Sequence, residues 1–178
     1  MEENRSIWKE TFMYGLIYGL ISVVVSLLVY MMDLMFKPWI ALPSLLISII
    51  VLYFLLRSYR DHRNYGYITY GKSLGAGVIM NIYAAIIGAI FMYLLYSVID
   101  TGLIAKQMAM TENKMIAKGV PEGTIDQAMA IQAKFIKPWF IALMGVLTSV
   151  FYGFILSLIV SIFVKKSGNP LLEEEVKE

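Results

Sequence analysis

The residues that most resemble a reaction centre lie between positions 66 and 73, where Gly66, Gly71, Lys72 and Ser73 match the G-x-x-x-x-G-K-S pattern of a phosphate-binding loop. That loop needs a buried strand before it and a soluble helix after it. Here residues 57–65 are rich in arginine and tyrosine and cannot form a core strand, and the 27 residues after Lys72 are uncharged. We interpret the match as a coincidence, with Lys72 at the depth of lipid headgroups.

Two other kinds of chemistry have weaker support. The single histidine, His62, lies in a basic loop, where it is typical of a solvent-exposed side chain. Thioethers suit Cu(I), but the methionines between residues 108 and 129 are not densely arrayed, have no histidine among them, and are typical of flexible core filler. We therefore expect no catalytic residue, no metal and no cofactor, and a protein that is not an enzyme.

A basic cluster precedes the loop-like pattern. Arg57, Arg60 and Arg63 recur every three residues, so a helix places them near one face, and tyrosines alternate with them. Together with Lys72 they have two interpretations. They are either the positive charge and aromatic belt of a cytoplasmic membrane surface, or a specific site for anionic lipid headgroups or a phosphorylated ligand.

The composition tells which elements position these residues. The 178 residues are 59% apolar and only 16% charged, with a mean hydropathy of +0.70, whereas a soluble domain is about 45–50% apolar and about 25% charged. Four stretches lack charge entirely, and each is long enough to cross a bilayer once. Because backbone groups in lipid must pair within their own segment, these stretches are helices. We predict an all-α membrane four-helix bundle in a single domain over residues 1–178, with spans at about 11–32, 38–56, 73–99 and 138–164.

These stretches contain no Asp, Glu, Lys, Arg or His, which matters for function because pumps and intramembrane hydrolases need such groups at mid-depth. Asn81 is the most polar group there, and we expect it at a helix interface, bonded to another span, rather than lining a pore. Small residues at helical spacing favour close packing of helices, within the chain first and between copies second. They are Gly15, Gly19, Gly75 and Gly88.

Basic residues predict the orientation. The side with both termini and the 57–72 loop has nine lysines and arginines, against six on the other side. Because short cytoplasmic loops carry the excess of basic residues, we predict that both termini are cytoplasmic. The cysteine count of zero is compatible with either compartment.

A short internal repeat marks the start of two spans. Lys37-Pro38-Trp39 recurs as Lys137-Pro138-Trp139. Proline suits the first helical turn, tryptophan the headgroup depth, and lysine reaches water. With Trp8, these lysines and tryptophans are the predicted interface anchors. The repeat has two explanations, duplication of a hairpin or the common chemistry of helices that enter a membrane.

A segment over residues 100–137 separates spans three and four, and apolar residues at helical spacing predict an outer helical hairpin. The simplest arrangement lets span three continue beyond the membrane, turn at Gly119–Gly123 and return directly into span four, with its outgoing arm rising about 28 Å. Thr124 is the predicted N-cap of the returning helix, with Gln127 as its capping-box partner. The hairpin either packs on itself or also binds a partner at its tip. The tail, residues 165–178, is a short solvated end.

The tyrosine-rich stretch from Asn64 to Lys72, together with the excursion that turns at Pro121-Glu122-Gly123, resembles an uncharacterised family of small bacterial four-span membrane proteins classed as a domain of unknown function. The resemblance implies a bacterial inner-membrane location and transfers no functional residue.

Three functional hypotheses remain. The first is a non-enzymatic accessory or interaction subunit, the second a small transporter or channel acting as an oligomer, and the third an anionic-lipid-binding protein. The expected partners are membrane lipids and either further copies of the chain or a larger membrane complex, with no nucleic acid.

Overall fold

The computed structural model describes residues 6–166 and 168. Within them the protein is all-α, as predicted, and the only bridge between extended residues pairs Ile68 with Lys166. In chain order the elements are α1 (Ile7–Met31), the 3-10 turn η1 (Pro38–Ile40), α2 (Ala41–Arg63), α3 (Tyr70–Leu94), the π-helical turn η2 (Leu95–Ile99), α4 (Leu103–Ala117), α5 (Glu122–Phe135) and α6 (Pro138–Val164).

Four helices in the described part of the chain are long and apolar enough to cross a membrane. They cover Ile7–Met31, Pro38–Arg63, Tyr70–Ile99 and Pro138–Val164. The number of predicted spans is therefore confirmed, and the chain has the architecture of a multi-pass membrane protein. The helices extend beyond several predicted spans because helical structure continues into charged turns, such as the one that ends at Arg63.

The two Lys-Pro-Trp copies begin helices in the same way. Pro38 is the first residue of η1, which leads into α2, and Pro138 is the first residue of α6. Lys37 is extended, with φ −85° and ψ 122°, because the residue before proline avoids the helical region. The same restriction applies to Lys137 before Pro138, and α5 ends at Phe135, three residues before α6 begins.

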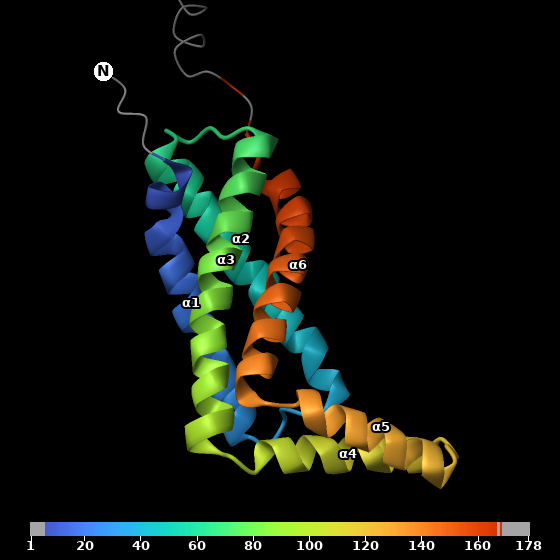
Figure 1. Ribbon diagram of the computed structural model, residues 1–178. Coiled ribbons are helices and arrows are strands. Elements are labelled where there is room, and N and C mark those ends of the chain that lie inside the picture. Colours follow the sequence, from blue (N-terminus) through green and yellow to red (C-terminus); the bar gives the residue numbers. More distant parts are fainter. Residues whose placement is uncertain (1–5, 167, 169–178) are drawn as a thin grey trace, which may run out of the picture. The chain divides into compact units, whose positions relative to one another are not determined.

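The described residues form two compact units. The first combines the described residues up to Ile87 with those from Thr148 onward, and the second is Gly88–Leu147. The first unit contains α1, α2, most of α3 and the C-terminal part of α6, side by side (Figure 1). Contacts of α1 with α3 keep a constant offset along both helices: Gly15 lies against Tyr83 and Gly19 against Ile87. A constant offset means that the two helices run parallel.

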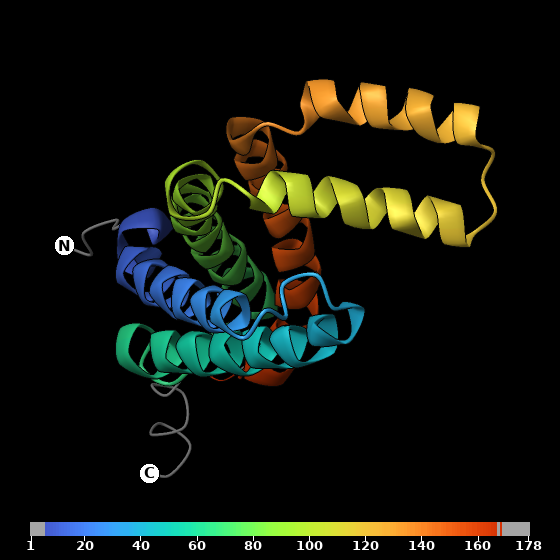
Figure 2. The ribbon, with the colours of Figure 1, turned by 90° about the horizontal axis from the view of Figure 1, so that it is seen from below.

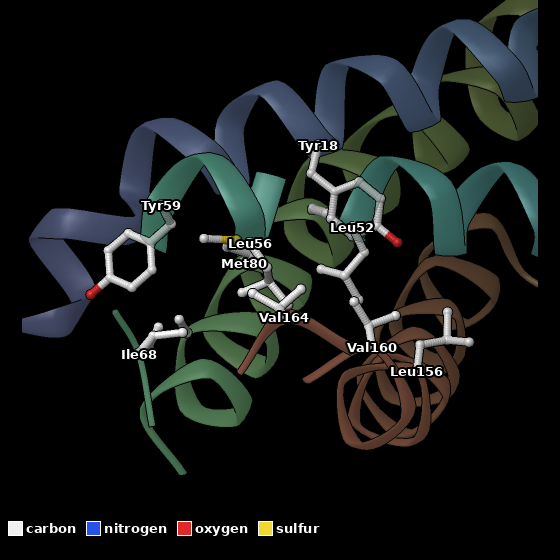
Figure 3. Close-up of a cluster of buried hydrophobic side chains, with 11 residues drawn as sticks. Tyr18, Leu52, Leu56, Tyr59, Ile68, Met80, Leu156, Val160 and Val164 are labelled. Carbon is white, nitrogen blue, oxygen red and sulfur yellow. The ribbon is translucent and has the colours of Figure 1, made fainter. Parts of the chain in front are cut away.

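The core of the first unit lies where its helices meet, as Figure 3 shows. Leu52, Leu56 and Tyr59 of α2 are fully buried. They pack in one cluster with Tyr18 of α1, Ile68 of the loop before α3, Ala76, Met80 and Ala84 of α3, and Leu156, Val160 and Val164 of α6. The cluster lies toward the C-terminal half of α2, so it fixes the end of the unit where the 64–69 loop and the last turn of α6 are found.

The second unit corrects the predicted hairpin. The last turns of α3 end in η2 at Ile99, Asp100 leaves the helical conformation with φ −143°, and α4 starts at Leu103. Within this unit α4 and α5 lie side by side and crosswise to the end of α3 and the start of α6 (Figures 1 and 2). The prediction that span three continues straight outward by 28 Å is wrong, because a turn closed by the Asp100 side chain interrupts the helix.

The start of the returning helix also differs from the prediction. α5 begins at Glu122 with Pro121 in the N-cap position and has no side-chain cap bond. Thr124 is therefore inside the first turn, where its backbone N–H donates to the Pro121 carbonyl at 2.9 Å. Proline replaces the predicted capping box because its fixed φ and missing N–H suit a helix start.

Candidate functional site

A seam between α3 and α6 contains most of the buried polar side chains described in the first unit. Ser73, Gly77 and Asn81 recur every four residues on α3, and Gly153, Ser157 and Ser161 do the same on α6. Ser73, Ser157 and Ser161 are completely buried and Asn81 is only 7% exposed. Residues four apart lie on one side of a helix, so each helix presents one stripe of small and polar residues to the other.

Hydrogen bonds set the register of this seam. The Asn81 side-chain amide donates to the Gly77 carbonyl at 2.8 Å, to Ser157 Oγ at 3.3 Å and to the Gly153 carbonyl at 3.4 Å. The Ser157 hydroxyl donates to the same Gly153 carbonyl at 2.7 Å. Asn81 therefore lies at a helix interface, bonded to another span, and not on an open path.

Close backbone approach accompanies these bonds. A Cβ atom added to Gly77 would lie 2.7 Å from Ser157 Oγ, and one added to Gly153 would lie 2.5 Å from Asn81 Cγ. Neither position has room for a larger residue. In lipid, where helices gain nothing from hiding apolar surface from each other, such close packing and interhelical bonds hold them together.

The seam continues toward the end of α6. Ser73 is one turn before Gly77, and Ser161 is one turn after Ser157, so the antiparallel register places these serines opposite each other. Among the described residues, neither hydroxyl has a hydrogen-bond partner. The Ile68–Lys166 bridge and a bond from the Tyr70 hydroxyl to the Leu158 carbonyl, at 3.3 Å, lie in the same part of the unit. The seam is thus a closed helix contact with two unused buried hydroxyls.

The sequence predicts Asn81 at a helix interface but does not identify its hydrogen-bond partners. The available signal was the four-residue spacing of Ser73, Gly77 and Asn81, repeated by Gly153, Ser157 and Ser161. That spacing predicts a polar stripe on each helix. It does not tell which two stripes meet.

The predicted packing glycines fall into two groups. Gly15 and Gly19 are in tight contact with α3, since a Cβ on either would approach Tyr83 or Ile87 within 2.7 Å. A Cβ on Gly75 would lie 3.7 Å from Ile7, an ordinary contact. Gly88 has no described atom within 4 Å of such a Cβ, so the prediction of close packing at Gly88 is wrong within the chain.

The four basic residues predicted to bind lipid headgroups differ in their contacts. Arg60 is engaged inside the first unit: its Nη1 donates to the Val164 carbonyl at 3.1 Å, and its Nε pairs with Asp61 at 2.7 Å. Arg57 Nε lies 3.7 Å from Asp61 Oδ2, and the Arg57 side chain is half exposed. Arg63 and Lys72 are exposed. Arg60 therefore caps the end of α6, whereas the other three present charge to the surroundings.

The same end of the unit is tied to α1. The Tyr59 hydroxyl donates to Glu10 Oε2 at 2.8 Å, and the Tyr14 ring packs edge-on against the Tyr59 ring with centroids 5.7 Å apart. The Lys166 ammonium nitrogen, Nζ, lies 5.0 Å from the centre of the Tyr67 ring. These contacts join α1, α2, the 64–69 loop and the end of α6, so the basic end is a defined surface and not a loose loop.

The residues predicted as interface anchors lie at or next to helix starts. Trp39 and Trp139 are 56% and 57% exposed, and Lys37 and Lys137 are exposed next to them. Trp8 differs, because its ring packs edge-on against the Tyr83 ring with centroids 5.9 Å apart. The matching exposure of the two Lys-Pro-Trp tryptophans suits a position at the headgroups.

In the hairpin of the second unit α4 and α5 are in contact, and Leu103 of α4 and Ile125 of α5 are buried. Three large apolar side chains remain exposed on it, Ile116, Ile131 and Phe135. In the described ranges, 6–166 and 168, no group of three or more histidine, aspartate and glutamate side chains is arranged to hold a metal ion.

Residues 13–166 match the family described as Protein of unknown function (DUF4199). The chain belongs to this family. The matched range includes α1 from Met13 onward, the other three membrane-competent helices, the α3–α6 seam and the hairpin, so these features lie within the DUF4199 domain. No curated protein and no solved structure is similar enough to the chain to count as a match.

Proposed function

We propose that this DUF4199 protein is a non-enzymatic accessory subunit of a membrane assembly, which acts by contacting a partner through the tip of the α4–α5 hairpin. The observation that supports this function best is the exposure of Ile116. Its side chain is 57% exposed one turn before the Gly119 turn, on a hairpin that carries too many charges to lie within a bilayer core. Contact with a partner protein would remove this apolar side chain from water.

The charge around Ile116 indicates the kind of partner. Glu112 lies one turn before Ile116 on the same side of α4 and is exposed. The tip therefore combines an apolar side chain with an acidic one. The matching partner surface has an apolar pocket with a basic rim, as in the extramembrane part of another membrane protein.

The transporter alternative has less support. A transport path needs polar groups that face an open channel, whereas the Asn81 amide is used in three bonds and the glycines beside it leave no room for a further atom. The closed seam favours a structural role for Asn81.

The proposed location is the bacterial inner membrane with both termini in the cytoplasm. In the first unit the end with the 64–69 loop has exposed lysines and arginines from α1, α2, α3 and the residues after α6: Lys9, Arg57, Arg63, Lys72, Lys165 and Lys166. Such a cationic surface is attracted to the anionic cytoplasmic leaflet. This attraction requires no specific lipid site.

A photo-crosslinking residue at position 116 tests the proposed function in native membranes. Lys114 is the matched control position, because it is also exposed but lies about 200° around α4. We expect one protein to be captured from position 116 and not from 114, and to be lost when the crosslinking chain also carries Glu112→Lys. Capture of lipid alone, or of a second copy of the chain alone, contradicts an accessory role.

A further inference from the structure

A second apolar surface lies on α5, away from the tip. Ile131 and Phe135 are four residues apart, so they share one side of the helix. Their side chains are 59% and 56% exposed, although α5 is a charged helix outside the four spans. The side of α5 that faces α4 is elsewhere on the helix, at the buried Ile125. The hairpin therefore leaves this apolar side of α5 uncovered.

The opposite side of α5 is acidic. Glu122 precedes Ile131 by nine residues, and Asp126 precedes Phe135 by nine, which is about two and a half helical turns in each case. Both acidic residues are exposed. The helix thus separates two apolar side chains from two acidic ones across its diameter, the pattern of a helix at a boundary between an apolar phase and water.

Connections at both ends keep this helix pair next to the bilayer. Only Asp100–Gly102 separate the end of η2 from α4, and only Ile136 and Lys137 separate α5 from α6. A two-residue connection spans at most about 7 Å. The C-terminal end of α5 is therefore close to the start of a membrane-competent helix.

The apolar side of α5 continues into the aromatic anchor of α6. The Phe135 ring lies 5.8 Å from the Phe140 ring, and the Phe140 ring lies 5.6 Å from the Trp139 ring. Trp139 belongs to the second Lys-Pro-Trp copy and is exposed at the first turn of α6. Phe135 thus points toward the part of the second unit where lipid begins, not toward bulk water.

The corner that begins α4 sets the direction of the hairpin. Asp100 Oδ1 accepts a bond from the Gly102 backbone N–H at 3.0 Å, and the Tyr96 hydroxyl donates to Gln107 Oε1 at 3.4 Å, across the corner. Within the second unit α4 and α5 consequently lie crosswise to the end of α3 and the start of α6 (Figure 2). A hairpin crosswise to membrane-spanning segments runs along the membrane surface.

We propose that α5 is an interfacial helix, with Ile131 and Phe135 inserted into the lipid leaflet from which α6 begins, and Glu122 and Asp126 facing water. Lys134, next to Phe135 and exposed, is positioned to extend toward headgroup phosphates. The occupant of this surface is lipid. The tip at Ile116 remains available for a protein, so the lipid contact does not depend on the proposed function.

Site-directed spin labelling tests the proposal, and the lack of native cysteine makes each label unique. Ile131→Cys and Phe135→Cys place a nitroxide on the apolar side, and Asp126→Cys is the matched control on the opposite side of the same helix. The purified chain is reconstituted in nanodiscs of phosphatidylethanolamine and phosphatidylglycerol, without any partner. The readout is the ratio of collision with oxygen, which concentrates in lipid, to collision with a water-soluble nickel chelate.

We expect this ratio to be at least threefold higher at residues 131 and 135 than at 126. Equal ratios, or preferential collision with nickel at 131 and 135, overturn the proposal. Low collision with both reagents also overturns it, because the surface is then covered by protein. If that protection disappears with one chain per nanodisc, the cover is a second copy. Failure of crosslinking from position 116 leaves these ratios unchanged, so the two proposals fail separately.

Discussion

At the scale of single residues, Gly153 controls how closely α6 approaches α3. A Cβ there would lie 2.5 Å from Asn81 Cγ and 2.6 Å from Asn81 Cβ. Because the Cβ of Asn81 is fixed to the helix, the clash cannot be relieved by rotating a side chain. We expect Gly153→Ala to lower the free energy of unfolding by about 1–3 kcal/mol, measured by thermal or denaturant unfolding in detergent micelles.

Gly145 is the matched control for this substitution. It lies on the same helix, is exposed, and has no described atom within 4 Å of the place where an alanine methyl would lie. Gly145→Ala should therefore be neutral or stabilise by up to about 1 kcal/mol, since alanine is the better helix former. Equal destabilisation by both substitutions would show that helix propensity, and not contact with Asn81, decides the outcome.

The seam also shows what a sequence reveals about single residues. Asn81 was predictable because an amide in lipid needs a partner. Gly77 and Gly153 were not, because Gly88 and Gly71 have the same character in sequence yet stand against open space. In a membrane protein both the lipid-facing and the packed sides of a helix are apolar. Composition therefore cannot say which glycine touches a neighbour.

At the scale of elements, Arg60 links α2 to the end of α6 by donating to the Val164 carbonyl. The last carbonyls of a helix have no partner within the helix, and a cation there also interacts favourably with the helix dipole. We expect Arg60→Gln to lower the free energy of unfolding by about 1 kcal/mol. Denaturant unfolding of the detergent-solubilised chain measures it.

Arg63→Gln supplies the comparison, because Arg63 is exposed three residues further along the same helix. It removes the same charge without removing a contact with α6, so its effect should stay within about 0.5 kcal/mol. A larger loss for Arg63→Gln than for Arg60→Gln would mean that total charge at this end, and not the bond to α6, matters for stability.

Element boundaries show a similar division between what is predictable and what is not. Proline correctly predicted the starts of η1, which leads into α2, and of α6, because its restriction of the preceding residue is local. The corner at Asp100–Gly102 was missed, because apolar spacing continues on both sides of it. The bond from the Gly102 backbone N–H to the Asp100 side chain and the Tyr96–Gln107 contact both lie at the corner where α4 changes direction.

At the scale of the whole molecule, charge is sorted along the chain. Even the described charges that fall inside the long helices, such as Lys9, Glu10, Arg57 and Arg60, lie within the first two or last two turns. The Glu10 carboxylate accepts a hydrogen bond from the Tyr59 hydroxyl, and Arg60 donates one to the Val164 carbonyl. Within the first unit these partly buried polar contacts therefore serve packing between helices. The tail beyond residue 168, with Lys177, and the segment before Ser6, with Arg5, lie outside the described residues.

Orientation is the prediction that belongs to the whole chain. Single cysteines at Ser6, before α1, and at Ala117, at the end of α4, are both exposed positions on opposite sides of the predicted topology. In bacterial spheroplasts a membrane-impermeant maleimide should label Ala117→Cys at once and Ser6→Cys only after lysis, because the basic end is retained in the cytoplasm. Lysed samples control for reactivity, since both cysteines must then react. Labelling of Ser6→Cys in intact spheroplasts would invert the topology and place the hairpin on the cytoplasmic side.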